Sequence, residues 1–165
     1  MNCPSCGAPL RLRDGRESAT CDYCNAVYLP EKNDDGVRVF DQASELNCPI
    51  CSLPLYHSTL VRQRFLYCTH CRGALIPMAV FVVLVEALRS RRGGAVEIAP
   101  VPEGHELARR VDCPQCHRRM DTHFYAGGGN VVLDDCSRCE LNWLDAGELM
   151  TIARAPDRSL RSPLD

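Results

Sequence analysis

Short apolar stretches separated by turn-forming residues dominate the chain, and this pattern predicts small β-hairpins. Residues 131–133 (Val-Val-Leu) follow the stretch 126–130 (Ala-Gly-Gly-Gly-Asn), which predicts a hairpin tip with 131–133 as its return strand. Residues 37–40 (Val-Arg-Val-Phe) come after the polar turn 31–36 and predict another short strand. The chain is therefore expected to be mainly β.

Residues 78–88 form the longest apolar segment and predict a helix instead. They follow Pro77, which suits the first turn of a helix, and lead into arginines that suit a helix C-terminus. The many β-branched residues leave a strand as the alternative. A helix that is apolar nearly all round needs cover, either from the rest of the chain or from a partner. Self-association through residues 77–92 is one way to supply that cover.

A second, shorter helix is expected after residue 145. The sequence Asp-Ala-Gly-Glu at 145–148 has the spacing of a capping box. In that motif Asp145 accepts a hydrogen bond from a helix amide and Glu148 reaches back to the Asp145 amide. Leu149, Ile152 and Ala153 follow at helical spacing.

Cysteine is the compositional outlier, with 12 in 165 residues. Every cysteine belongs to a C-x-x-C pair, and successive pairs lie 14, 23, 16, 41 and 19 residues apart. The gaps of 14, 16 and 19 residues suit a hairpin, so consecutive pairs are expected to combine, rather than a crossed RING-like order. Such spacing is typical of a four-cysteine metal site. The predicted ligands are Cys3, Cys6, Cys21 and Cys24; Cys48, Cys51, Cys68 and Cys71; and Cys113, Cys116, Cys136 and Cys139.

The same three units show an internal repeat. Each begins with C-P-x-C followed four places later by an apolar residue, namely Leu10, Leu55 or Met120. The fourth cysteine of each unit is followed at the same offset by an apolar pair, at 28–29, 75–76 and 143–144. We call the three units ribbon 1, ribbon 2 and ribbon 3. Units this small are too short for a self-sufficient apolar core, so a metal is expected to hold each one together.

The predicted sites are closed. Four thiolates complete a tetrahedral shell and leave no position for water or substrate, so the chain is expected not to be an enzyme. His70 and His117 lie in or beside the cysteine pairs, but the ligand sets are complete without them. Zn²⁺ is the expected metal, three ions per chain. Iron in a rubredoxin-like electron-transfer site, or a redox role for the cysteine pairs, is the alternative.

Nucleic-acid binding is a further alternative, which charge weakens. The chain holds 19 basic and 21 acidic residues, and three Zn²⁺ ions with twelve thiolates move the net charge from −2 to about −8. Phosphate binding relies on a basic face. One candidate patch remains, where Arg62 and Arg64 alternate with Phe65 and Tyr67. The partner is therefore expected to be a protein rather than nucleic acid.

Ribbon 3 resembles the TFIIB-type zinc ribbon family. The resemblance lies in C-P-Q-C at 113–116, C-S-R-C at 136–139 and W-L-D-A-G-E-L at 143–149. The family usually has glycine where this chain has Leu141, and ribbon 2 keeps it as Gly73. Ribbon 2 resembles a divergent copy, and ribbon 1 resembles zinc ribbons generically. The resemblance implies zinc at the matching cysteines, and the family's name implies a transcription-associated role.

These observations together predict a small metal-stabilised, mainly β protein of three tandem four-cysteine zinc ribbons, with short helices after the second and third. The N-terminus lacks a basic and apolar leader, and the longest uninterrupted apolar run is eight residues, whereas a membrane span needs roughly 20, so a cytoplasmic protein is expected. The expected divisions are ribbon 1 at 1–40, ribbon 2 with its helix at 41–92, a linker at 93–108, ribbon 3 with its helix at 109–155, and a tail at 156–165.

Overall fold

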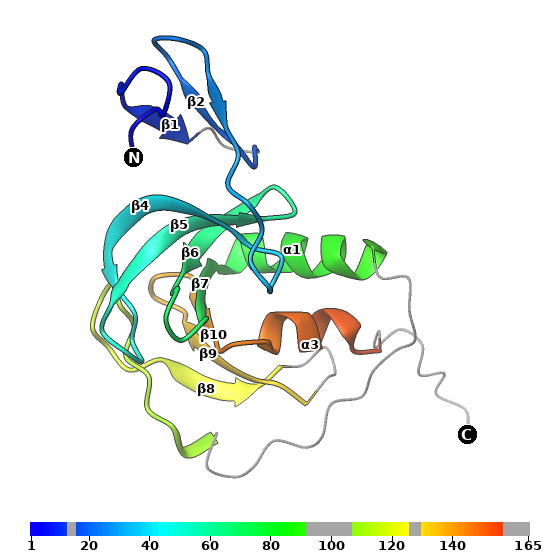
Figure 1. The fold of residues 1–165 in the computed structure, drawn as a ribbon. Coiled ribbons are helices and arrows are strands. Elements are labelled where there is room, and N and C mark those ends of the chain that lie inside the picture. The colour runs from blue at the N-terminus through cyan, green and yellow to red at the C-terminus, as the bar shows by residue number, and fades with distance from the viewer. Residues whose placement is uncertain (13–15, 92–106, 126–129, 157–165) are drawn as a thin grey trace.

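The computed structural model describes residues 1–12, 16–91, 107–125 and 130–156. These residues form two antiparallel sheets and two helices, α1 and α3 (Figure 1). The smaller sheet has the order β1-β2-β3, and the larger one has the order β4-β5-β6-β7-β10-β9-β8. The strands are β1 (Leu10–Leu12), β2 (Ala19–Cys21), β3 (Val27–Tyr28), β4 (Arg38–Asn47), β5 (Pro54–Leu60), β6 (Gln63–Tyr67), β7 (Ala74–Pro77), β8 (Asp121–Phe124), β9 (Val132–Cys136) and β10 (Leu141–Leu144).

The three ribbons share one plan, as the repeat predicts. Each is a three-stranded antiparallel unit, β1-β2-β3, β5-β6-β7 or β8-β9-β10. Within each unit, the residue two places before the third cysteine pairs with the residue four places after the fourth cysteine. These pairs are Ala19 with Tyr28, Leu66 with Leu75, and Asp134 with Trp143. The predicted mainly β, metal-stabilised class is therefore the observed one.

Ribbons 2 and 3 share a continuous sheet because their third strands pair with each other. Strands β7 and β10 run antiparallel, with Leu75 opposite Trp143. These two residues occupy the same position in the repeat, so the pairing relates the two ribbons by an approximate two-fold axis. A Cβ atom on Gly73 would lie 2.2 Å from the Trp143 ring. A side chain at 73 would therefore displace the Trp143 ring. Leu141, at the matching position of ribbon 3, lies opposite Pro77 and in the same buried cluster as Leu75.

The two helices lie side by side on one face of the large sheet (Figure 1). Helix α1 spans Met78–Arg91 and α3 spans Glu148–Arg154. Residues 78–88 are thus helical, and the strand alternative is wrong. Pro77 ends β7 instead of starting the helix. The buried side chains of α1 and α3 meet those of β6, β7 and β10 in one core, namely Phe81, Leu84, Val85, Leu149, Ile152, Phe65, Tyr67, Ala74, Ile76 and Leu144.

Strand β4 is longer than the sequence indicates. A short strand is expected at residues 37–40, but β4 continues to Asn47 and pairs with β5 through two register shifts. Its outer half is polar and alternates between partly buried and exposed positions, as an edge strand with one solvated face does. Phe40 is fully buried and packs with the ribbon 1 residues Leu10 and Ala19. The strand therefore crosses the division expected at residue 40.

Several expectations fall on residues outside those described. The linker at 93–108 is described only at 107–108, and the hairpin tip at 126–130 only at Asn130. The tail at 156–165 is described only at Pro156. Neither of the two helices is long and apolar enough to cross a membrane.

Candidate metal centres

The twelve cysteines gather into three sets of four, in the combinations predicted from the gaps. Within each set all four Sγ atoms lie within 4.8 Å of one another. Sulfur atoms from opposite C-x-x-C turns approach to 3.4–3.7 Å, and none forms a disulfide. Consecutive pairs combine within each hairpin, so the crossed arrangement does not occur. We call the sets site 1, site 2 and site 3 after their ribbons.

Each C-x-x-C turn, together with the residue after it, forms a tight knuckle of one design. In the first knuckle of ribbon 2, the Ser52 amide donates to the Cys48 carbonyl at 2.9 Å, and the Cys48 amide donates to the Leu53 carbonyl at 2.8 Å. The residue after the second cysteine has a positive φ in all six knuckles, which turns the chain back across the sulfur atoms. These residues are Gly7, Asn25, Ser52, Arg72, His117 and Glu140.

This backbone geometry explains His117 without a metal-binding role. Its φ of 57° places it at the left-handed position of a knuckle, where histidine is tolerated better than β-branched residues. His117 and His70 are both exposed, and no histidine belongs to a metal-ligand cluster among the described residues. The structure thus places both histidines on the surface and outside the metal-ligand clusters, as the sequence indicates.

The three sites differ in burial. The first cysteine of every knuckle is buried. The second cysteines of ribbon 1, Cys6 and Cys24, are exposed, whereas their counterparts in ribbons 2 and 3 are partly buried. Sites 2 and 3 lie in one cluster with Leu75, Met120 and Trp143, on the sheet face opposite the helices. Site 1 therefore has less protein around it.

The thiols within one site differ in pKa because they differ in burial and in the hydrogen bonds that they accept. At site 3, a hydrogen bond from the Arg118 amide is the main influence that lowers the pKa of Cys116 to about 7. Desolvation, followed by hydrogen bonds to the neighbouring sulfurs, raises the pKa of Cys139 to about 12. At site 2, the Leu53 amide lowers the pKa of Cys51, while burial raises that of Cys48. A cation in the middle of the four sulfurs removes this conflict, because it favours every thiolate.

The donor set fits a thiophilic tetrahedral ion. A metal–sulfur bond of about 2.3 Å places the sulfurs of a regular tetrahedron about 3.8 Å apart, close to the observed cross-knuckle separations. An ion held by all four sulfurs would have a complete tetrahedral shell.

Behind site 3 lies a buried charge network that sequence reasoning missed. Asp134 is fully buried on β9 and accepts hydrogen bonds from Arg109 and from the Thr122 hydroxyl, both at 2.5 Å. Arg109 also pairs with Asp145. Burial, the largest single influence, lowers the pKa of Arg109, but the hydrogen bonds that it donates to the two carboxylates raise this pKa overall. The doublet Asp134-Asp135 in an otherwise apolar strand was the signal that could have revealed this network.

The network also corrects the expected capping box. Glu148 does reach back, accepting from the Asp145 amide at 2.6 Å. The Asp145 side chain instead accepts from the Trp143 indole nitrogen at 3.1 Å and from Arg109. The residue that caps α3 is Gly147, with φ 84° and no side-chain cap. The W-L-D-x-G-E-L segment therefore ties the tryptophan of the β7–β10 seam to the start of α3.

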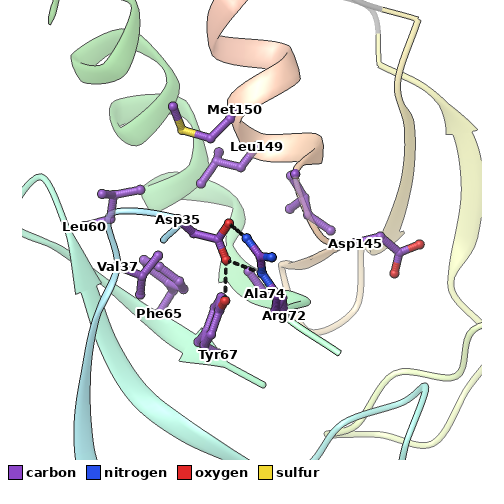
Figure 2. Close-up of a pocket in the computed structure, with 12 residues that line it drawn as sticks. Asp35, Val37, Leu60, Phe65, Tyr67, Arg72, Ala74, Asp145, Leu149 and Met150 are labelled. Atoms are coloured by element: carbon purple, nitrogen blue, oxygen red, sulfur yellow. Dashed lines mark hydrogen bonds and ion pairs between the residues drawn. The ribbon is translucent and has the colours of Figure 1, made fainter. Parts of the chain in front are cut away.

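A small pocket lies where the turn after ribbon 1 meets ribbons 2 and 3 (Figure 2). Its volume of about 30 Å³ is room for a water or two. Asp35 accepts hydrogen bonds from the Tyr67 hydroxyl at 2.5 Å and from Arg72 Nε at 2.9 Å. Arg72 lowers the pKa of Asp35, and burial with the Asp35 contact raises that of Tyr67 to about 12. The polar groups of the pocket satisfy one another, which indicates a structural tie between the turn and the Cys68–Cys71 knuckle.

The candidate nucleic-acid patch of the second hairpin does not form a stacking surface. Phe65 and Tyr67 are buried on the helix-covered face, so neither ring is available for base stacking. The Arg62 amide donates to Glu17 of ribbon 1, and the Arg64 guanidinium lies 5.9 Å from the centre of the Phe40 ring. The alternation of arginines and aromatics in this hairpin thus marks the two faces of an ordinary strand.

Comparisons of this chain with protein-family models, with characterised proteins and with solved structures found no match. The TFIIB-type resemblance therefore rests on the motifs of ribbon 3 alone. Fold and sites together define a small, mainly β protein with three four-cysteine groups, each able to hold a metal ion.

Proposed function

We propose that each of the three sites binds one Zn²⁺ ion and that the protein is a zinc-organised scaffold for a protein partner. The zinc proposal rests on one observation. The twelve cysteines form three separate sets of four, and within each set the four sulfur atoms lie within 4.8 Å of one another. Zinc suits these sites because it prefers tetrahedral thiolate ligation and undergoes no redox change of its own. The ions serve to fold and hold the ribbons.

The scaffold role follows from the closed shells. A closed four-sulfur site supports no catalysis at the metal, so the function of the ribbons lies in the surfaces that they present. The partner is a protein because zinc loading makes the chain more acidic and because the arginine–aromatic hairpin is occupied internally. The motif resemblance of ribbon 3 supports a transcription-associated setting.

The structure narrows the helix surface available to a partner. Phe81, Leu84 and Val85 of α1 face the core, whereas Val82 and Val83 are 56% and 46% exposed. Self-association through residues 77–92 stays a prediction, restricted to the Val82/Val83 face. Substituting Val82 and Val83 by serine tests it, because neither side chain supports the core.

Metal analysis of the purified full chain tests the zinc proposal. We expect about three zinc ions per chain and no visible absorption, with loss of β structure when a chelator removes the metal. A coloured protein that holds iron at these sites would support the electron-transfer alternative and refute the proposal. A chain that keeps its fold after complete metal removal would refute the structural role of the metal.

A further inference from the structure

The third strand of each ribbon has a pairing edge, and two of the three edges are used. In ribbons 2 and 3, β7 and β10 pair with each other about the approximate two-fold axis at Leu75 and Trp143. The matching strand of ribbon 1 is β3, which forms the edge of the small sheet. No strand of the described residues pairs with its outer side.

The outward side chains of this edge are exposed in ribbon 1 and buried in its two counterparts. Val27 is 66% exposed, while its equivalents Ala74 and Asn142 are 6% and 4% exposed. Leu29 is 51% exposed, and its equivalents are fully buried. Those equivalents, Ile76 and Leu144, lie in the core that the β7–β10 pairing and the two helices create. Ribbon 1 thus has apolar residues at the positions that the β7–β10 pairing and the helices bury in ribbons 2 and 3, but its own third strand has no such cover among the described residues.

Charge distinguishes this edge from the other sheet edges of the molecule. Edge strands are usually protected by charged residues that discourage pairing with another chain. Charged side chains occur on β1 (Arg11), on β4 (Arg38, Asp41 and Glu45) and on β8 (Asp121, with His123 bound to Asp135). Residues 25–30 (Asn-Ala-Val-Tyr-Leu-Pro) carry no charge. The β3 edge is therefore the one sheet edge among the described strands that carries no charged side chain.

The second knuckle of ribbon 1, which leads into β3, carries an exposed aromatic residue. Tyr23 is 84% exposed and lies between Cys21 and Cys24. The equivalent positions of ribbons 2 and 3 are polar, His70 and Arg138. At this position ribbon 1 thus exposes an aromatic ring where its copies have polar side chains, and tyrosine is enriched at protein interfaces.

We propose that the β3 edge of ribbon 1 pairs with the β3 edge of a second copy of this chain, in the register that joins β7 to β10. In that register Tyr28 lies opposite Tyr28 of the second copy, and Val27 lies opposite its Leu29. Pro30 then falls at the end of the paired segment, where Pro77 stands in β7. A self-complementary strand with no charge satisfies the two-fold symmetry that such a dimer requires.

The dimer rests on the proposed function in one respect, since ribbon 1 needs its metal to hold β3 in place. The paired segment is short, so the association is expected to be weak and to depend on protein concentration. It is separate from the Val82/Val83 face of α1, which belongs to ribbon 2. The two surfaces can therefore be tested independently.

Charge substitution in the zinc-loaded full chain provides the test, read by sedimentation velocity over a wide concentration range with zinc content measured on each sample. We expect reversible dimers of the wild-type protein. Val27→Glu with Leu29→Glu places like charges opposite one another and is expected to weaken the dimer about 100-fold. Mixing this variant with Val27→Lys/Leu29→Lys is expected to restore association, because each Glu then faces a Lys. Val82→Glu with Val83→Glu removes any association through the α1 face instead, and is expected to leave the β3 dimer in place, so the two surfaces are distinguished.

A photo-crosslinking residue at position 27 gives a second readout in an otherwise native chain. We expect a cross-link to residues 27–30 of a second copy; cross-links confined to the same chain would overturn the proposal. A wild-type protein that stays monomeric with three zinc ions bound would also overturn it, as would a dimer lost in the α1 control and kept in the Glu variant. If protein as purified holds a metal other than zinc and still dimerises as expected, the zinc proposal alone is refuted.

Discussion

Ribbon 1 and the joined ribbons 2 and 3 are built from the same hairpin, yet they are buried to different extents. Ribbons 2 and 3 pair along β7 and β10, and α1 and α3 cover the resulting sheet. Ribbon 1 has no following helix. It rests on the large sheet through Phe40 and through contacts of Glu17 with Arg38 and with the Arg62 amide. In Figure 1 it projects from the rest of the molecule.

This difference shows what a four-cysteine hairpin lacks. The knuckles and the register are the same in all three ribbons, so metal and backbone geometry are sufficient to specify the hairpin. They do not bury the third strand. In ribbons 2 and 3 the third strands pair with each other, whereas the third strand of ribbon 1 stays at a sheet edge. The predictions below test whether the metal alone supports ribbon 1 while packing also supports its copies.

The largest effect is expected from removing one buried cysteine in each region. Cys21→Ser and Cys68→Ser are matched, because both sulfurs belong to fully buried residues. Each change removes most of the binding free energy of a structural zinc, about 10 kcal/mol. We expect Cys68→Ser to remove amide-exchange protection throughout β5–β10, and Cys21→Ser to remove it only within β1–β3. Zinc analysis and hydrogen exchange with mass spectrometry measure both outcomes.

A different distribution of lost amide-exchange protection in either variant would contradict this difference between ribbon 1 and ribbons 2 and 3. Loss of protection in β7 and β10 on Cys21→Ser would show that ribbon 1 supports the large sheet. Intact protection of β10 on Cys68→Ser would show that ribbon 3 stands without ribbon 2. In that case the β7–β10 seam adds little stability.

The next largest effect is expected in the charge network of ribbon 3. Arg109→Met removes the partner of Asp134, which is fully buried and then holds an unpaired charge. We expect a loss of about 3–5 kcal/mol in unfolding free energy. Arg110→Met, at the exposed neighbour, is the control and is expected to change stability by less than about 0.5 kcal/mol. Urea unfolding in the presence of zinc measures both, and equal effects would refute the role of the network.

A smaller effect is expected at the seam between ribbons 2 and 3. Gly73→Ala places a Cβ atom against the Trp143 ring and is expected to cost about 1–3 kcal/mol. In a Trp143→Leu background the ring is gone, so the same alanine is expected to cost much less. A double-mutant cycle by urea unfolding measures the coupling. Additive effects of the two changes would show that Gly73 is not required by the seam.

The hairpins could be predicted from the sequence because their determinants are local. The C-x-x-C spacing identified the three sets of cysteines, and the repeat identified the apolar positions beside them. Pro77 and the arginines after residue 88 favoured a helix, which is observed as α1. Each of these signals depends on residues within a single hairpin or a single helix.

The seam and the network could not be predicted because they join residues far apart in the chain. Four apolar residues in β7 indicate a buried strand but not which strand lies beside it. The exchange of Gly73 for Leu141 was visible in the sequence, and its reason appears only when Trp143 is seen against Gly73. Asp145 fitted a capping box locally, but its carboxylate is engaged by Arg109 and Trp143.

The smallest effect is a pH dependence confined to ribbon 3. Burial raises the pKa of Glu148 to about 7, above its ordinary value of 4.5. The folded protein then binds this proton more tightly than the unfolded chain, so stability is lost as the pH rises from 4.5 to 7 and is level above that range. Between pH 6 and 8 we expect a loss of roughly 1 kcal/mol.

Glu148→Gln keeps an acceptor for the Asp145 amide and is expected to remove this dependence, measured as the difference between the two proteins in saturating zinc. Ribbon 1 lacks any counterpart of this carboxylate, so its amide protection should be the same in both proteins at each pH. An identical pH dependence in the two proteins would show that Glu148 is ionised throughout this range.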